Sequence, residues 1–297
     1  MLPMKKSLLV IAIIALALLL CSCGTIGYTY INGNRYTAGE TTIRDRVDEL
    51  DINWLEGSVT VEYHDSSRIE VTETSGRSLS SDKQLHWYLE GRTLHVRYAK
   101  AGVRMLNGLD KHLTIKLPRE LELDKVKIAV ASAEVAADGI NAEDILIQSA
   151  SGRVALRQTG SAESIKVETA SGAVAIAVAD AERLKVNSAS GEVVVDAYTM
   201  DELGIDTASG KITVQLATAA DRIDVNSVSG NVTLYWPEGE GFTADVDSLS
   251  GRVGGSLALN SRDKGEYSYL GGGCEIKVDT VSGNVMFEKN ATAAKGW

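Results

Sequence analysis

A Ser-Gly dipeptide recurs along the second half of the chain at a nearly constant spacing. Its serines are 20, 19, 19, 20, 21 and 32 residues apart, at Ser151, Ser171, Ser190, Ser209, Ser229, Ser250 and Ser282. A period near 20 residues that is sustained over this length is typical of a solenoid, in which each repeat forms one coil that stacks on the next. This repeat constrains the fold more than any other feature of the sequence.

Each repeat alternates apolar and polar residues on both sides of its Ser-Gly. Apolar residues stand six and four positions before the serine, as at Ile165 and Val167, and three and usually five positions after it, as at Val174 and Ile176. A period of two is typical of a half-buried strand, so we expect one short strand on each side of the turn. Such coils bury their apolar sides only against the coils above and below. The sequence therefore predicts an all-β fold, a parallel β-solenoid that is β-helix-like.

A hydroxyl residue two positions before each serine shares the parity of the apolar positions. We expect these side chains to point inward and to hydrogen-bond one another and the turn backbone; they are Ser149, Thr169, Ser188, Thr207, Ser227, Ser248 and Thr280. The glycine allows a sharp turn with positive φ and no Cβ clash between coils. A catalytic role for the serines would require a base. Because all four histidines precede the repeats, at His64, His86, His95 and His112, the structural interpretation is favoured.

An imperfect copy of the repeat precedes the first Ser-Gly. In residues 124–135, Val126, Ile128, Ser132 and Val135 match the pattern, whereas Ala133 stands where glycine is expected. The sequence thus predicts about eight coils of roughly 20 residues.

Residues 47–118 differ from the repeats and alternate as strand pairs, including a hairpin that turns at residues 89–92. We expect an N-terminal β-rich cap that protects one end of the solenoid from edge pairing. His86 and His95 could face each other across the hairpin, but they have no cysteine or carboxylate partners at metal-ligand spacing, so surface histidines are the favoured interpretation.

The first 23 residues indicate export. Lys5 and Lys6 precede an apolar run over residues 8–20 that is short for a membrane span and suited to a signal peptide. The sequence LCSC then ends at Cys23 and resembles a bacterial lipobox, which implies that Cys23 receives the lipid. Cys21 stands where such motifs usually carry Ala, Ser or Thr, and LLLC ending at Cys21 is a poorer alternative. An ordinary cleaved signal peptide or an uncleaved anchor remains the other hypothesis.

These features divide the chain into five segments. We expect a lipoprotein signal peptide over 1–22, a polar tether over 23–46, the cap over 47–118, the solenoid over 119–288 with an insertion at 254–275, and a C-terminal tail over 289–297. The mature protein is then exported to the bacterial cell envelope and lipid-anchored to the outer face of the membrane. Without Cys21 and with Cys23 acylated, Cys274 has no partner for an internal disulfide.

The net charge of −10 and the absence of a basic stripe argue against a nucleic-acid partner. The glycine triplet over residues 271–273 favours a tight turn over an anion-binding loop, because no Lys-Ser/Thr follows it. Cys274 has no neighbouring His or Arg in the sequence that would activate it, which favours a packed thiol.

Carboxylates recur three positions before the serine, at Glu168, Asp206, Asp247 and Asp279. A Ca²⁺ site or a catalytic acid pair is the alternative hypothesis here. Asn187 separates Glu168 from Asp206, and Asn226 follows Asp206 before Asp247, which indicates avoidance of charge repulsion rather than a catalytic pair. A cleft formed by the 254–275 insertion over this column would favour an enzyme.

Several segments together resemble a known family. They are WLEGSVTV at Trp54, LTIKLP at 113–118, the serial Ser-Gly-x-Val coils, and the closing KGEYSY, GGG and VDTVSGNV stretches. Over residues 47–288 the chain is similar to the bacterial "putative adhesin" family of β-strand-repeat proteins, domains of unknown function. The resemblance implies a surface location and roles in adhesion or envelope stress, with no agreed catalytic residue.

We therefore expect a non-enzymatic cell-surface lipoprotein, an adhesin or binding scaffold that presents a repetitive sheet face to a protein or a cell-wall glycan. No catalytic residue, metal site or cofactor is predicted. The alternatives are an accessory protein of envelope-stress signalling and a β-helix enzyme that acts on polysaccharide.

Overall fold

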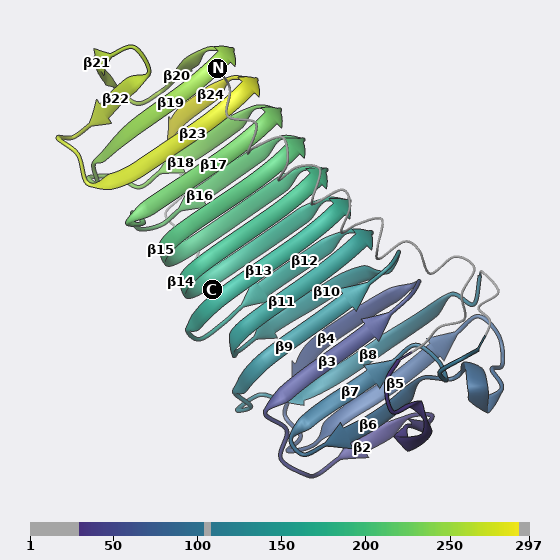
Figure 1. The fold of residues 1–297 in the computed structure, drawn as a ribbon. Coiled ribbons are helices and arrows are strands. Elements are labelled where there is room, and N and C mark those ends of the chain that lie inside the picture. The colour runs from purple at the N-terminus through teal and green to yellow at the C-terminus, as the bar shows by residue number, and fades with distance from the viewer. Residues whose placement is uncertain (1–29, 104–107, 291–297) are drawn as a thin grey trace.

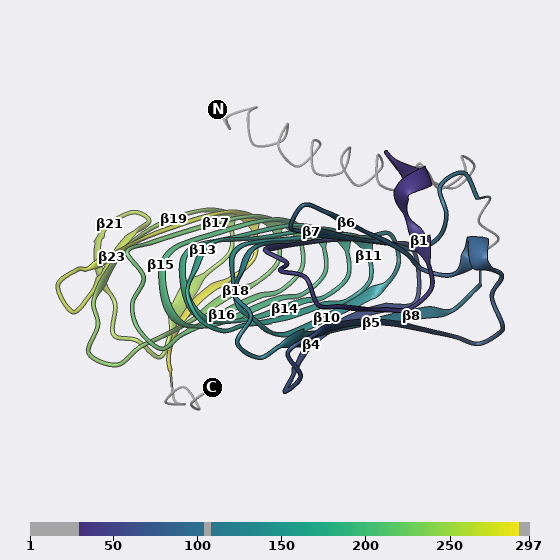
Figure 2. The same ribbon diagram turned by 90° about the horizontal axis from the view of Figure 1, so that it is seen from below.

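The computed structural model describes residues 30–103 and 108–290, and these form a parallel β-solenoid. Each level of the stack has one strand before a sharp turn and one strand after it, so the strands gather into two facing sheets (Figure 1). In Figure 2, where the coils are seen more nearly end-on, the sheets are the two long sides of each flattened coil. The all-β solenoid predicted from the sequence is confirmed.

Sheet A contains the strands that precede the turns. In spatial order they are β1 (Thr37–Ala38), β6 (His86–Glu90), β7 (Thr93–Arg97), β3 (Glu49–Trp54), β9 (Leu123–Val130), β11 (Ala142–Ser151), β13 (Ala162–Ser171), the second halves of β14 (Val174–Ser190) and β15 (Val193–Ser209), β17 (Arg222–Ser229), β23 (Cys274–Ser282), β19 (Phe242–Ser250), β22 (Glu266–Tyr269) and β21 (Asn260–Asp263).

Sheet B contains the strands that follow the turns. In spatial order they are β2 (Thr41–Ile43), β5 (Ile69–Ser75), β8 (Lys111–Pro118), β4 (Ser58–His64), β10 (Glu134–Ile140), β12 (Val154–Gln158), the first halves of β14 and β15, β16 (Ile212–Leu216), β18 (Val232–Trp236), β24 (Val285–Lys289) and β20 (Val253–Gly255).

The repeats stack in the register that their pattern predicts. Ile165 pairs with Leu184, and Ser171 with Ser190, in a parallel ladder. The imperfect repeat is also a coil, because Val126 pairs with Ile145 and Val135 with Val154. Ala133 does not adopt the positive φ of Gly152 and of most later turn glycines, so the chain makes this turn with a different backbone conformation.

The N-terminal region contributes two further levels to the same stack. Strands β3 and β4 lie parallel to β9 and β10, with Leu50 beside Val126 and Val59 beside Val135. Strands β7 and β8 stack on the outer side of β3 and β4. The described residues thus form ten two-strand levels, which span roughly 45 Å at about 4.8 Å per level.

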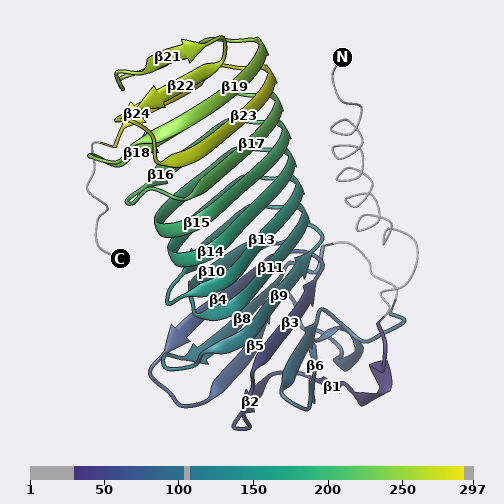
Figure 3. The ribbon, with the colours of Figure 1, turned by 60° about the vertical axis from the view of Figure 1, so that its left-hand side comes forward.

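The order of levels departs from chain order at both ends of the stack. Residues 93–118 form the outermost N-terminal level, outside residues 49–64. At the other end, β23 pairs with β17 on one side and β19 on the other, so the last coil of the chain lies inside the coil that precedes it. Figure 3 shows β19 beyond β23 at this end.

Antiparallel strands cover both ends of sheet A and the N-terminal end of sheet B. Strands β6 and β1 extend sheet A, and β5 and β2 extend sheet B. Strands β1 and β2 lie within the expected 23–46 tether, so part of that segment is paired to the solenoid rather than free. The hairpin of β6 and β7 is confirmed, with Glu90 opposite Thr93.

The core is the narrow space between the two sheets, lined by the alternating apolar positions. Ile147, Val167 and Val186 are fully buried on sheet A, and Val154 and Val193 on sheet B. The inward hydroxyls behave partly as expected. Thr169, Ser188 and Thr207 donate to carbonyls two residues ahead, at 2.9, 3.2 and 3.2 Å, but no hydroxyl-to-hydroxyl bonds link these three.

A buried ion pair lies near the N-terminal end of the solenoid. Lys111 is fully buried, its Nζ lies 2.5 Å from Glu73 Oε2, and it lies against the rings of Trp54 and Tyr98. No helix in the described ranges is long and apolar enough to cross a membrane.

Candidate functional site

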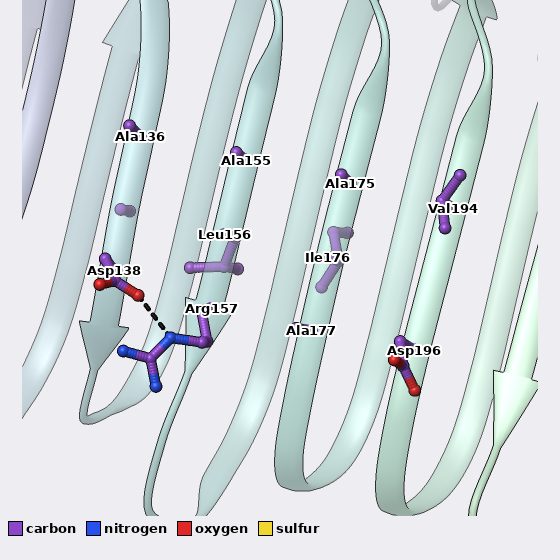
Figure 4. Close-up of a pocket in the computed structure, with 11 residues that line it drawn as sticks. Ala136, Asp138, Ala155, Leu156, Arg157, Ala175, Ile176, Ala177, Val194 and Asp196 are labelled. Atoms are coloured by element: carbon purple, nitrogen blue, oxygen red, sulfur yellow. Dashed lines mark hydrogen bonds and ion pairs between the residues drawn. The ribbon is translucent and has the colours of Figure 1, made fainter. Parts of the chain in front are cut away.

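A shallow apolar groove of about 400 Å³ lies on the outer surface of sheet B, across four levels from β10 to β15. Its floor is the column of side chains four positions after the turn serine. These are Ala136, Ala155, Ala175 and Val194, which lie side by side in Figure 4. The groove forms because this column is reduced to small apolar side chains on consecutive levels.

Polar side chains stand at the same register beyond both ends of this floor. Thr60 on β4 is beside Ala136, and Thr213 on β16 is beside Val194. The inward Leu156 and Ile176 lie beneath the floor and are almost fully buried. The groove therefore has a rigid base formed by the solenoid core.

Charged residues border the groove two positions further along the strands. Arg157 Nε forms an ion pair with Asp138, as Figure 4 shows, and this contact raises the pKa of Arg157. On the next level the corresponding residue is Ala177, and on the level after that it is Asp196. Burial raises the pKa of Asp196. The groove can thus accept an apolar body with charged groups at one border.

The acidic column of sheet A is engaged in local pairs. Glu168 lies 2.7 Å from Lys166 Nζ and accepts a 2.8 Å hydrogen bond from Gln148. Burial raises the pKa of Glu168, but the contacts with Lys166 and Gln148 outweigh it and the net shift is downward. Asp206 lies 3.4 Å from Lys185 Nζ and accepts a hydrogen bond from Asn226.

At one end of this column the carboxylates are not separated by asparagine, and the expectation from the sequence is wrong there. Because β23 lies between β17 and β19, Asp279 is directly beside Asp247, and Asn226 is beside Asp279. Lys277 Nζ lies 3.8 Å from Asp279. No group of three or more His, Cys, Asp or Glu side chains within residues 30–103 and 108–290 is placed to hold a metal ion.

The 254–275 insertion does not fold over the acidic column. Its strands β21 and β22 continue sheet A, with β22 antiparallel to the first half of β19. The insertion therefore extends the edge of the sheet and does not build the cleft that would have favoured an enzyme.

The histidines of the N-terminal hairpin are not partners of each other. His86 stands opposite Arg97, and His95 stands opposite Tyr88. His95 Nδ1 lies 2.9 Å from Asp51 Oδ2, and His86 Nδ1 contacts the carbonyl of Gln84. Each histidine therefore has its own local partner.

The glycine triplet makes the turn between β22 and β23. All three residues have positive φ, and Gly272 donates to the carbonyl of Tyr269. Cys274, which follows, is buried, and burial raises the pKa of its thiol to about 12. This thiol is a packed side chain. Cys23, the predicted lipid-bearing residue, and the predicted 1–22 signal peptide lie outside the described residues.

The groove was not predicted from the sequence, although a signal for it exists. Alanine occupies the fourth position after the serine in three successive repeats, at Ala136, Ala155 and Ala175. A column of outward-facing residues is usually recognised in a sequence by its polarity. A column of small residues forms a groove only if the neighbouring columns are taller, and the sequence does not show which columns are neighbours.

Comparison with known proteins gives a family and similar solved structures. The model of the Toastrack DUF4097 family matches residues 47–288. No curated protein matches the chain at a significant level.

The similar solved structures have low sequence identity. One named a putative adhesin, from Parabacteroides distasonis, is 14% identical over 84% of this chain and 95% of its own, with a TM-score of 0.44. Another putative adhesin, from Bacteroides fragilis, is 10% identical over 84% and 95%, with a TM-score of 0.43. A protein named a putative lipid binding protein, from P. distasonis, is 16% identical over 85% and 94%, with a TM-score of 0.42.

Proposed function

The chain belongs to the Toastrack DUF4097 family, and from this premise we propose that it is a non-enzymatic surface lipoprotein that acts as an adhesin or binding scaffold. The observation that carries the proposal is the apolar groove on sheet B. It is the feature of the solenoid in which an open, small-residue floor, a rigid base and bordering charges occur together.

The physical character of the groove supports binding rather than chemistry. A preformed concave apolar surface with a few charged groups at its border favours orientation and specificity of a ligand. The floor is built on two-strand levels whose backbones are held by ladders on both sides, so little conformational entropy is lost when a ligand binds. The partner in this proposal is a protein or a component of the cell wall.

The proposal includes export and anchoring through a lipid on Cys23. The support is the LCSC sequence after an apolar run of signal-peptide length. In this arrangement the acidic protein is held at the outer face of the membrane by its lipid, because a net charge of −10 does not favour binding to anionic headgroups.

An array of glycans, cell-wall fragments and envelope proteins, probed with the full chain in detergent, tests the proposal. Ala175→Phe fills the groove at a half-exposed position. Ala170→Phe adds the same bulk at a half-exposed position of sheet A in the same coil, and serves as the matched control. We expect saturable binding that Ala175→Phe abolishes and Ala170→Phe retains, with or without Ca²⁺. Binding that both variants retain, or the absence of any binding, would contradict a role for the groove.

A further inference from the structure

The floor of the groove is apolar and lies close to the main chain of sheet B. It presents only the side chains of Ala136, Ala155, Ala175 and Val194, and the main chain beneath them is fixed by parallel ladders. A bound segment must therefore lie close to the sheet surface. Methyl and methylene groups of a ligand can pack directly on this floor.

Asp196 is a carboxylate without a cation beside it. It is half-buried at the groove border, and within the described part of the chain no side chain forms an ion pair with it. A partly desolvated carboxylate of this kind gains most from a ligand that brings a positive charge. This end of the groove therefore fits an amino group.

Arg157 offers the opposite charge two levels away. It contacts Asp138 through Nε, so its two Nη groups can still donate to a ligand carboxylate. Ala177 occupies the intervening level and leaves the space between the two charges open. At about 4.8 Å per level, the two charged positions are roughly 10 Å apart along the stack.

We propose that this groove binds a short extended peptide that carries both a free amino group and a free carboxylate, the chemistry of the stem peptide of the bacterial cell wall. The amino group pairs with Asp196, the carboxylate pairs with Arg157, and the methyl groups cover the alanine floor. This inference rests on the proposed binding function and specifies its ligand.

Isothermal titration calorimetry of the full chain in detergent tests the assignment. The probe is a synthetic stem peptide, N-acetyl-L-Ala–γ-D-Glu–diaminopimelate–D-Ala, in which the side-chain amine of diaminopimelate is the single free amino group. Two further probes have the side-chain amine acetylated or the carboxylates amidated. We expect each modification to weaken binding about 10-fold or more, as the loss of a charge-assisted contact does.

Two charge variants assign the contacts. Asp196→Asn should weaken binding of the unmodified peptide about 10-fold and remove the effect of acetylation, whereas Arg157→Gln should remove the effect of amidation. Glu192→Gln is the matched control, because Glu192 is an exposed carboxylate in the turn just before the strand that carries Asp196 and lies outside the groove. It should leave the affinity unchanged, and circular dichroism confirms that each variant is folded.

The results separate the two proposals. If the peptide does not bind, or if its affinity is insensitive to both charge variants, the ligand assignment is wrong. In that case the binding function still stands if any ligand on the array depends on Ala175, and it falls as well if none does.

Discussion

Gly191 illustrates how closely the coils approach each other at the Ser-Gly turns. Its φ is +126°, and a Cβ there would overlap the carbonyl oxygen of Gly172 on the adjacent level. We expect Gly191→Ala to lower the free energy of unfolding by about 3 kcal/mol, from backbone strain and overpacking together. Urea denaturation measures the loss.

Gly204 provides the control for that prediction. It lies in β15 without positive φ, and a Cβ added there would be 3.9 Å from its nearest neighbour, an atom of the Lys185 side chain. Gly204→Ala should therefore be neutral or stabilising by up to about 1 kcal/mol. Equal losses in the two variants would contradict the steric explanation of the turn glycines.

Asp51 links the N-terminal levels through charge. Burial alone raises its pKa, but hydrogen bonds and charges from His95 and Arg97 outweigh burial and lower the pKa to about 2. Against an ordinary value of 3.8, this shift corresponds to about 2 kcal/mol of stability. Because the folded pKa is depressed, the contribution is present above pH 4 and is lost as the pH falls towards 2.

The corresponding experiment compares Asp51→Asn with the unmodified protein by urea denaturation between pH 7 and pH 2. The difference in free energy of unfolding should be constant above pH 5 and shrink by about 2 kcal/mol between pH 4 and pH 2. Asp82→Asn, which removes the exposed pair with Lys100, should cost less than about 1 kcal/mol. If the difference in free energy of unfolding between Asp51→Asn and the unmodified protein does not change with pH, the pKa of Asp51 is not lowered by folding.

At the scale of the element, the Ser-Gly dipeptide determined which coils could be predicted from the sequence. Eight coils were predictable because each has the Ser-Gly or its near match. The coil over 49–64 has Glu56 in place of the serine. In the outermost coil, Lys111 occupies the position of the glycine and its backbone faces Gly57 of the next level. Neither coil therefore displays the Ser-Gly dipeptide.

The exchange of the last two coils was not predictable for a different reason. Every coil offers the same alternation and the same backbone ladder, so the pattern fits any stacking order. The connection from Trp236 to Phe242 allows the chain to skip a level, and the insertion brings it back. The same exchange explains why the arrangement of Asp247 and Asp279 could not be predicted. The groove could not be predicted either, because it depends on which columns of outward-facing side chains lie next to each other.

Cysteine pairs test the exchanged order directly. Asn226 is paired with Asp279, and Asp247 is two levels from Asn226. We expect Asn226→Cys with Asp279→Cys to form a disulfide under mild oxidation, because neighbouring strands fall within bonding reach. Asn226→Cys with Asp247→Cys should not, at roughly 10 Å. A gel shift on oxidation measures both, and a crosslink only in the second pair would indicate stacking in chain order.

At the scale of the whole molecule, the proposed lipid on Cys23 would act through the N-terminal segment. Tyr30 packs edge-on against Tyr36, and Arg97 lies over both rings, which joins this segment to sheet A at the N-terminal end. Only residues 24–29 separate Tyr30 from Cys23, and the seven steps between these two residues reach at most about 25 Å. In the proposed arrangement, an anchor on Cys23 would hold the N-terminal end of the solenoid close to the membrane and leave the groove several levels away.

The anchor itself is tested by the two neighbouring cysteines. If Cys23 carries the lipid, Cys23→Ser should move the protein from the membrane fraction to the soluble fraction, because one acylated residue supplies the membrane affinity. Cys21→Ser differs by the same single atom and should leave the protein with the membrane. Release by Cys21→Ser alone would assign the lipid to the alternative site, whereas retention of both single variants and of the double variant would indicate an uncleaved apolar anchor. In either case the distance from anchor to solenoid changes, and the orientation derived from residues 24–29 would have to be replaced.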